Sequence, residues 1–169
     1  MENYELRHFG IEDWQSYKKI RLEALFSTPE VFGSNYQKES AYSDEEWIAL
    51  LENPKCAMFG LYDLGTLVGL TGVVLDRADE SNAILIASFI QEAHRGKGLS
   101  GLFYRARIAW AAAQGCVRVT VSHRVGNEAS KAANQSFNFR YSHSQEVLWP
   151  DGLKAEELIY VLNLSSFML

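Results

Sequence analysis

The sequence contains few cysteines, no long apolar run and no excess of positive charge. Its two cysteines, Cys56 and Cys116, have no partners at the spacing of metal ligands, so the sequence indicates neither a disulfide framework nor a metal site. No apolar run approaches the roughly 18 residues that a membrane-spanning helix needs. Residues 1–5 lack the basic start and apolar core of a signal peptide. These absences predict a cytoplasmic protein with reduced thiols and no membrane partner.

The charge balance argues against nucleic acid as a partner. Sixteen Lys and Arg residues stand against 21 Asp and Glu residues, which gives a formal net charge of -5. Binding to a phosphate backbone draws on a basic field, and this chain has none. A chain of 169 residues that is 47% hydrophobic suits one domain, residues 1–169, with a sizeable core. Composition allows a homodimer as well as a monomer.

The first fifty residues predict a strand, a helix, a long loop and a second helix. Residues 4–9 alternate polar and apolar side chains, and residues 11–26 repeat apolar side chains at helical spacing. Residues 28–42 have no clear period, so we expect a loop whose length is typical of a functional segment. A capping-box pattern at Ser43 opens the second helix, and Pro54 closes it.

The rest of the chain predicts a hairpin, a crossover and a closing hairpin. Residues 56–62 and 66–75 are apolar runs joined by a short turn, which predicts two antiparallel strands. Residues 83–91 form a nearly continuous apolar strand, and residues 99–114 form an alanine-rich helix. The apolar side of that helix is predicted to comprise Leu102, Phe103, Ala106, Ala109, Trp110 and Ala113. The remaining elements are a strand over 117–121, a helix over 127–137 that Asn138 ends, and strands over 141–148 and 157–162.

This order of elements predicts a mixed α/β (α+β) fold. We expect a mostly antiparallel sheet flanked by helices, with one parallel β-α-β crossover. The crossover is predicted to be right-handed and to bring the strands around Ile90 and Val119 side by side.

Residues 95–100, Arg-Gly-Lys-Gly-Leu-Ser, are the most informative segment for function. They lie between the apolar strand and the helix that starts near Leu99. Two glycines allow a tight turn that brings backbone N–H groups close to a ligand, and the helix directs its positive end at the same place. Arg95 and Lys97 add positive charge. The segment therefore predicts a cradle for a pyrophosphate.

The same glycines also match the dinucleotide fingerprint G-x-G-x-x-G, as Gly96, Gly98 and Gly101. That fingerprint normally opens a doubly wound sheet, but only about seventy residues follow it here. The acidic residue expected after the next strand is also missing. Arg124 could bind a 2′-phosphate, so an NADP-binding protein remains a remote alternative. A Walker loop is excluded because Gly98, and not Ser or Thr, follows Lys97.

With these residues the chain resembles the GCN5-related N-acetyltransferase (GNAT) family. The cradle matches the R/Q-x-x-G-x-G/A motif of that family, except that Ser100 stands at the last small position. The second motif, an Asn before a helix and a terminal Phe, matches Asn127 and Phe139. The resemblance implies acetyl-CoA as the cofactor, its pyrophosphate held by the cradle amides. The cofactor-binding residues it implies are Ile90, Gln91, Arg95, Gly96, Lys97, Gly98, Leu99, Ser100, Asn127, Ser130 and Asn134.

The resemblance also implies catalytic roles, and here the sequence departs from the family. The backbone N–H near Ile90 would face the carbonyl oxygen of the thioester. The family usually places a Tyr, as proton donor, seven residues after the motif Asn, and this chain has Asn134 there. Asn134 is a candidate cofactor contact. His123, predicted just past the end of its strand, is the first candidate base, with Glu92 and Glu39 as alternatives.

The expected function is transfer of an acetyl group from acetyl-CoA to a primary amine. The acceptor is a small molecule or the amine of a protein N-terminus or lysine. The net negative charge favours cationic acceptors such as polyamines, aminoglycosides or amino-acid-like amines. A non-catalytic protein that binds or senses acyl-CoA is the alternative. The candidate substrate residues lie in two loops: Phe32, Tyr36, Glu39 and Trp149.

Overall fold

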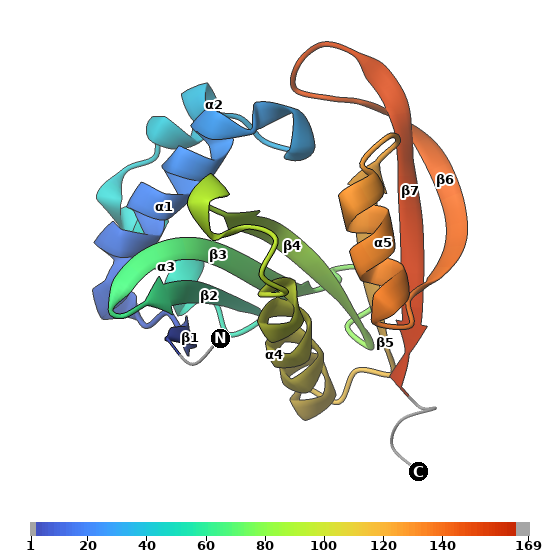
Figure 1. Ribbon diagram of the computed structural model, residues 1–169, viewed down its shortest axis with the longest axis horizontal. Coiled ribbons are helices and arrows are strands. Elements are labelled where there is room, and N and C mark those ends of the chain that lie inside the picture. Colours follow the sequence, from blue (N-terminus) through green and yellow to red (C-terminus); the bar gives the residue numbers. More distant parts are fainter. Residues whose placement is uncertain (1–2, 165–169) are drawn as a thin grey trace.

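The computed structural model describes residues 3–164, which form one seven-stranded sheet in the order β1-β2-β3-β4-β5-β7-β6 (Figure 1). Only β4 and β5 pair in parallel; the other neighbours are antiparallel. The predicted fold class is confirmed. The strands are β1 (Tyr4–His8), β2 (Cys56–Asp63), β3 (Thr66–Leu75), β4 (Asn82–Ile90), β5 (Arg118–Arg124), β6 (Arg140–Leu148) and β7 (Lys154–Asn163). The helices are α1 (Trp14–Ser27), α2 (Tyr36–Ser40), α3 (Asp44–Glu52), α4 (Ser100–Ala113) and α5 (Glu128–Ser136).

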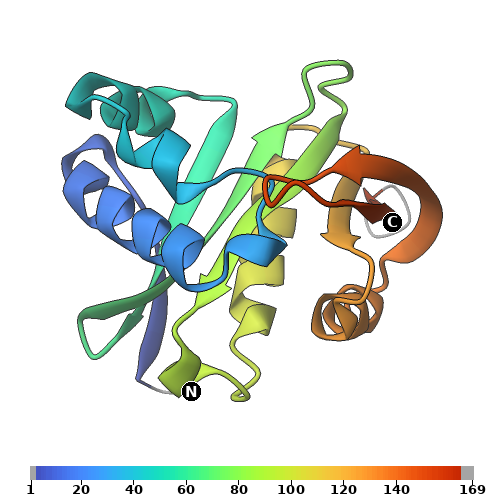
Figure 2. The same ribbon diagram turned by 90° about the horizontal axis from the view of Figure 1, so that it is seen from above.

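Helices cover both faces of this sheet. Figure 2 shows α1 and α3 on one side and α4 on the other. Each side has its own core. On the side of α1 and α3, Trp47 of α3 and Leu70 of β3 are fully buried, and on the side of α4, Val73 and Val119 are fully buried. None of the helices between residues 3 and 164 has the length and apolar character needed to cross a bilayer.

Local sequence signals explain where several elements begin and end. The β2–β3 turn has positive φ at Leu64 and Gly65, as a two-residue hairpin turn of the primed type requires. Ser43 accepts a hydrogen bond from the N–H of Glu46 and caps α3, as the sequence predicts. Asn138 ends the segment after α5 with a left-handed φ of 69°, also as predicted.

The prediction of an irregular loop over residues 28–42 is wrong in part. The segment contains a 3₁₀ turn, Pro29–Val31, and the short helix α2. The Asn35 side chain accepts a hydrogen bond from the N–H of Lys38 at 2.8 Å and starts that helix. A five-residue helix is too short to give a helical period, so its cap was the usable signal.

Strands β4 and β5 are joined at one end and separate at the other. Their pairing is confined to Asn82–Ile84 and residues 118–120, so Val119 lies beside Ala83. The prediction that the strands around Ile90 and Val119 lie side by side is confirmed, although their pairing stops before Ile90. Ile90 pairs with Gly69 of β3, and its other edge faces the opening between the two strands.

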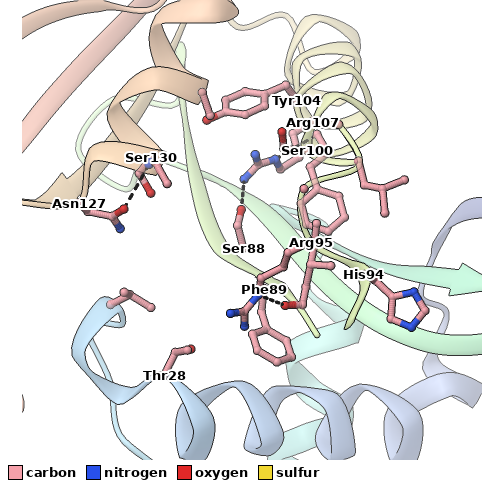
Figure 3. A pocket seen from close by; sticks show the side chains of 18 residues that line it. Thr28, Ser88, Phe89, His94, Arg95, Ser100, Tyr104, Arg107, Asn127 and Ser130 are labelled. Atoms are coloured by element: carbon pink, nitrogen blue, oxygen red, sulfur yellow. Dashed lines mark hydrogen bonds between the residues drawn. The ribbon is translucent and has the colours of Figure 1, made fainter. Parts of the chain in front are cut away.

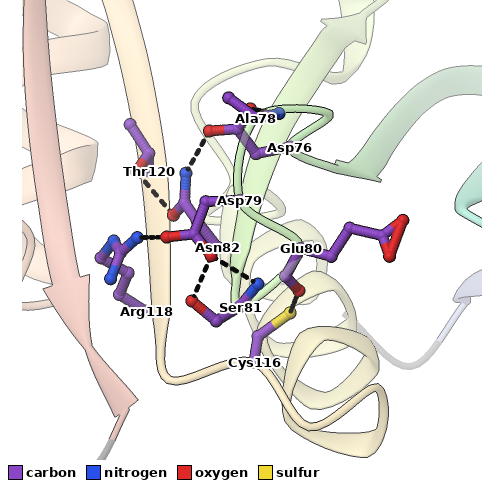
Figure 4. A network of polar contacts seen from close by, with 9 residues as sticks. All are labelled: Asp76, Ala78, Asp79, Glu80, Ser81, Asn82, Cys116, Arg118 and Thr120. Atoms are coloured by element: carbon purple, nitrogen blue, oxygen red, sulfur yellow. Dashed lines mark hydrogen bonds and ion pairs between the residues drawn. The ribbon is translucent and has the colours of Figure 1, made fainter.

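A polar network holds the joined end (Figure 4). The buried Asn82 side chain donates to Asp76 at 3.2 Å and accepts from the hydroxyl of Thr120 at 2.8 Å. Arg118 pairs with Asp79 beside it. Because these contacts fix where the strands meet, they also fix where the opening begins.

The side of α4 that faces the sheet differs from the predicted apolar side. The buried residues include Phe103, Tyr104, Arg107 and Ala111, whereas Ala109 is exposed. The alanines and Trp110 predict a buried face that is displaced by about one residue along the helix from the observed one. The real face carries two polar side chains, which the period of apolar residues does not register.

Candidate active site

Two adjoining cavities occupy the opening between β4 and β5. The larger, of about 490 Å³, lies between the cradle, α4 and α5 (Figure 3). The smaller, of about 190 Å³, lies between β4, β5 and the segment after α1. Their walls have six residues in common, so the two spaces meet there: Val31, Ser88, Tyr104, Arg107, Asn127 and Ser130.

The cradle has the backbone that its sequence predicts. Gly96 and Gly98 both have positive φ, 74° and 73°, a conformation that other residues adopt only at a cost. A Cβ atom at either position would meet no atom within 4 Å, so the space above the turn is open to a ligand. The turn runs directly into α4, which begins at Ser100, and the N–H groups of Gly101 and Leu102 donate to the carbonyls of Gly98 and Leu99.

The cradle residues differ in where their side chains lie. Arg95, Gly96, Gly98, Leu99 and Ser100 line the larger cavity. Lys97 lines neither cavity, because its amine donates to the Tyr4 hydroxyl at 3.2 Å.

Ile90 presents its backbone to the opening. The N–H of the next residue, Gln91, donates to Val68 of β3 at 2.9 Å. Backbone groups alternate in direction along an antiparallel strand, so the N–H and C=O of Ile90 point to the other edge of β4. There the carbonyl accepts from Arg95 Nε at 2.7 Å. The side chain of Gln91 donates to Glu23 on α1 and lines neither cavity.

Helix α5 contributes three of the predicted site residues. Asn127 caps the helix by accepting from the N–H of Ser130 at 3.2 Å, and both residues line the two cavities. Asn134 is 1% exposed and lines the smaller cavity, where its Oδ1 accepts from the Tyr104 hydroxyl at 2.5 Å. Its Nδ2 is buried without a partner. Position 134, where the resemblance implies a tyrosine and this chain has an asparagine, therefore has the phenol of Tyr104 from α4 beside it.

His123 lies within β5 and not past its end, which corrects the predicted end of that strand. It is 7% exposed, stacks on Tyr160 and lines the smaller cavity. Its Nδ1 lies 2.9 Å from the carbonyl oxygen of Arg124. A carbonyl oxygen can only accept, so Nδ1 carries the proton and Nε2 is the basic nitrogen. Nε2 is buried and has no hydrogen-bond partner.

Of the four predicted acceptor-binding residues, the structure places one in the cavity walls. Phe32 lines the smaller cavity and is 6% exposed. Tyr36 packs against Phe26 on the surface. Glu39 is buried, and both of its carboxylate oxygens accept from Arg21, at 2.9 and 3.0 Å. Trp149 is buried with its ring nitrogen donating to a backbone carbonyl. The last three line neither cavity.

Arg124 links the segment after α1 to the β6–β7 turn. Its guanidinium donates to Asp151 at 2.7 Å and to the carbonyl of Glu30 at 3.3 Å, and it lies over the Trp149 ring. The hydrogen bond from Arg124 and a second one from the Leu153 N–H hold the pKa of Asp151 below its usual range. Trp149 thus packs on Arg124 and not in the wall of either cavity.

The sequence analysis missed two site residues, Tyr104 and Arg107. Arg107 is 2% exposed and lines both cavities. Burial lowers the pKa of its guanidinium to about 10, with a smaller opposing effect from Tyr104. Burial also raises the pKa of the Tyr104 phenol, and the charge of Arg107 opposes that rise. The sequence contains a pattern that could have indicated these two residues. Ser100, Tyr104 and Arg107 are spaced four and three residues apart, which places three polar side chains on one face of a helix.

The described residues offer no metal site, because residues 3–164 contain no group of three His, Cys, Asp or Glu side chains placed to bind an ion. The polar groups that converge on the cavities are backbone amides, hydroxyls, two amide side chains, two histidines and two arginines.

A family model of the acetyltransferase (GNAT) family matches residues 14–139. No curated protein matches the chain. Among solved structures, an N-acetyltransferase from Staphylococcus aureus Mu50 is 21% identical with a TM-score of 0.79, over 96% of this chain and 99% of that one. A Salmonella typhimurium protein with its cofactor acetyl-CoA is 16% identical with a TM-score of 0.80, over 96% and 94%. Ribosomal L7/L12 alpha-N-protein acetyltransferase with coenzyme A is 15% identical with a TM-score of 0.77, over 96% and 95%.

Proposed function

Because the chain belongs to the acetyltransferase (GNAT) family, we propose that it is an N-acetyltransferase that joins an acetyl group to a primary amine. Its cofactor is acetyl-CoA, as in a neighbouring structure of the same fold. The observation that carries the proposal is the opening between β4 and β5, where a glycine cradle and an unpaired strand edge meet a second, smaller cavity. Two cavities that share a wall suit direct transfer between two bound molecules.

The residues of the larger cavity fit coenzyme A. The open turn at Gly96 and Gly98 has room for a pyrophosphate that a Cβ atom would occupy. The N-terminus of α4 and Arg95 supply positive charge beside it. The edge of β4 at Ile90, which β5 does not pair, would lie along the pantetheine arm, with Asn127 and Ser130 on the opposite wall; the Ile90 carbonyl itself accepts from Arg95.

The thioester of the bound cofactor supplies an activated acetyl group. Ile90 would donate its backbone N–H to the acetyl carbonyl oxygen, where negative charge develops. His123 would take a proton from the acceptor amine at Nε2, since Nδ1 is occupied by the carbonyl of Arg124. Asn134 would contact the sulfur with an N–H of its amide, which donates a hydrogen bond but gives up no proton. As the C–N bond forms and the C–S bond breaks, coenzyme A would leave as a thiolate that takes a proton from water to give the free thiol.

The acceptor would enter the smaller cavity, past Phe32. Its class is a primary amine of a small molecule or of a protein N-terminus or lysine, and neither nucleic acid nor membrane is a proposed partner. Tyr36, Glu39 and Trp149 are better explained as supports of the surrounding loops, because their polar groups or rings are used within the protein. A cytoplasmic location and a homodimer belong to the same proposal.

Two measurements test the function. Calorimetry with coenzyme A measures binding, and release of the free thiol across a panel of amines measures turnover. We expect both. Binding without turnover on any amine would favour the alternative, an acyl-CoA sensor, which the missing tyrosine at Asn134 makes worth testing. No binding of coenzyme A would reject the site itself.

The role of His123 has its own test. His123→Gln should lower kcat/KM by roughly 10²–10⁴-fold and leave the Kd for coenzyme A unchanged, because a general base contributes about that much. His143, exposed on β6, provides the matched control as His143→Gln, which should behave like the wild type. Equal rates for the two variants would show that another group removes the proton.

A further inference from the structure

The smaller cavity has an unusual charge balance. Its wall contains no Asp or Glu side chain, and Arg107 is its one permanently charged group. An amine that carries a second positive charge would therefore find no carboxylate there and would lie close to a buried cation. At the low effective dielectric constant of such a space, that repulsion is large.

Arg107 itself has no counter-ion in the described part of the chain. Its Nε donates to the Phe103 carbonyl at 3.1 Å, and its Nη1 donates to the Ser88 hydroxyl at 3.1 Å and to the Gly72 carbonyl at 3.5 Å. All three acceptors are neutral. The other buried arginine, Arg21, shows the usual solution, a carboxylate that accepts two of its hydrogen bonds.

A buried guanidinium without an anion is costly to hold, so its persistence calls for an explanation. With a pKa of about 10, Arg107 remains a cation at neutral pH. None of residues 3–164 accepts a hydrogen bond from its Nη2. Figure 3 shows the guanidinium directed from α4 toward Ser88 and the space between the strands and α5. The cation thus meets the place where both cavities join.

We propose that the acceptor carries a carboxylate near its amine, as an α-amino acid does, and that Arg107 binds this carboxylate. This inference rests on the function proposed above and names the substrate class of the same site. The planar fork of an arginine suits a carboxylate, and a charge-assisted pair in this space would be strong. Arg107 then makes the site specific for acceptors with a carboxylate, and the amine of the acceptor lies toward His123 Nε2.

The size of the cavity agrees with this class. About 190 Å³ is less than the 300–1,000 Å³ typical of pockets for drug-sized ligands, so the acceptor is small. Phe32, Ile86 and Val121 give part of the wall an apolar surface that would pack against a short side chain. Among the cationic acceptors that net charge favours, amino-acid-like amines remain, and polyamines and aminoglycosides are set aside.

The first test uses the wild-type protein and matched acceptors. Alanine and leucine are compared with their amides, with ethylamine and isoamylamine, which lack the carboxyl group, and with putrescine. We expect kcat/KM for the amino acids to exceed the other values by at least about 10²-fold, because a site built around a polar group rejects analogues that lack it. The amine of an amino-acid amide is less basic than the amine of the amino acid. The amides would therefore react faster if the site had no preference for a carboxylate. A faster amide, monoamine or diamine overturns the proposal.

The second test removes the charge. Arg107→Met should reduce kcat/KM for leucine toward that of leucinamide, change the amide rate only a few-fold, and leave the Kd for coenzyme A unchanged. Arg105→Met, at an exposed position of the same helix, is the matched control and should keep the preference. An equal loss of rate on every acceptor would mean that the charge acts on the transferring group, which overturns the assignment. If Arg107→Met does not fold, the wild-type panel still decides.

The failure of this inference is distinct from that of the proposed function. The latter fails when coenzyme A does not bind or when no amine releases its thiol. If coenzyme A binds but no amine releases its thiol, calorimetric titration of leucine into the protein with saturating coenzyme A reports on the carboxylate site directly. If coenzyme A does not bind, the same titration is made with the protein alone. Absence of both binding and turnover for every carboxylate-bearing amine overturns the inference, even where another amine is acetylated.

Discussion

At the scale of single residues, Asn134 and Tyr104 show how a side chain can be supplied from a different helix. The resemblance implies a phenol at residue 134 on α5. The chain places an amide there, and α4 supplies a phenol whose hydroxyl lies 2.5 Å from that amide. Tyr104 also stacks on Phe137 of the α5 segment, with ring centroids 4.5 Å apart. The pair fills the wall of the smaller cavity, so the difference at residue 134 leaves no gap.

The glycine cradle gives the clearest prediction at this scale. Gly98→Trp should abolish coenzyme A binding, because the indole would occupy the open space above the turn. Calorimetry measures the effect. Gly115 is the matched control, since it also has positive φ, 84°, and open space, but it lies at the far end of α4. Gly115→Trp should carry a similar backbone cost and keep binding. Equal affinity for Gly98→Trp and the wild type would reject the cradle.

At the scale of elements, the short helix α2 depends on a buried ion pair with α1. Glu39 of α2 accepts two hydrogen bonds from Arg21 of α1, and Arg21 lies over the Phe32 ring. Burial raises the pKa of Glu39, but the hydrogen bonds and charge of Arg21 outweigh burial, so the pKa is lowered from the usual 4.5. This pair positions the segment that carries Phe32.

The pH dependence of stability follows from that pair. A carboxylate with a lowered pKa in the folded state stabilises the fold above its unfolded pKa, and this contribution is lost as the pH falls through the folded value. The free energy of unfolding of the wild type should therefore fall below pH 4.5 relative to Glu39→Gln. Urea titrations at pH 7 and at several values below 4.5 measure the difference. A constant difference across this range would contradict the assignment.

Helix α4 shows the limit of period analysis for an element. The sequence locates the helix to within a residue or two, from its apolar content and the glycines at both ends. Its orientation is predicted wrongly in part, because small alanines carry little information about which side is buried: Phe103 is buried as predicted, but Ala109 and Ala113 are exposed. The buried side includes Tyr104 and Arg107, which also contribute polar groups to a cavity.

At the scale of the whole molecule, the site exists because two strands of one sheet separate. The Asn82 network holds one end of β4 and β5, and a register shift near Leu70 and Gly72 accompanies a positive φ of 59° at Ala87. This bulge bends β4 away from β5 and turns Ser88 toward Arg107. The unpaired edge and both cavities follow from this one separation.

Coenzyme A should therefore stabilise the whole fold. A ligand that binds only the native state adds about 2.7 kcal/mol at a concentration of 100 Kd, which corresponds to a rise in Tm of roughly 5–10 °C for a chain of this size. A thermal denaturation series with increasing coenzyme A measures the rise. NADP at the same concentration should give no shift, which separates the acetyl-CoA site from a dinucleotide site. A larger shift with NADP than with coenzyme A would reverse the assignment.

The sequence by itself determined the order of the strands and of every helix except α2, the hairpin turn, the cap at Ser43, and the cradle between strand and helix. These features depend on neighbours in the chain, such as a glycine that permits positive φ or a side chain that reaches an N–H three residues ahead. Only the tertiary structure decided that Ile90 faces an open edge, that His123 is buried, and that Arg107 meets the smaller cavity with no counter-ion among residues 3–164. The register of β4 against β3 and β5, and the rotation of α4 on the sheet, are set by packing between residues far apart in the sequence, and no local pattern encodes them.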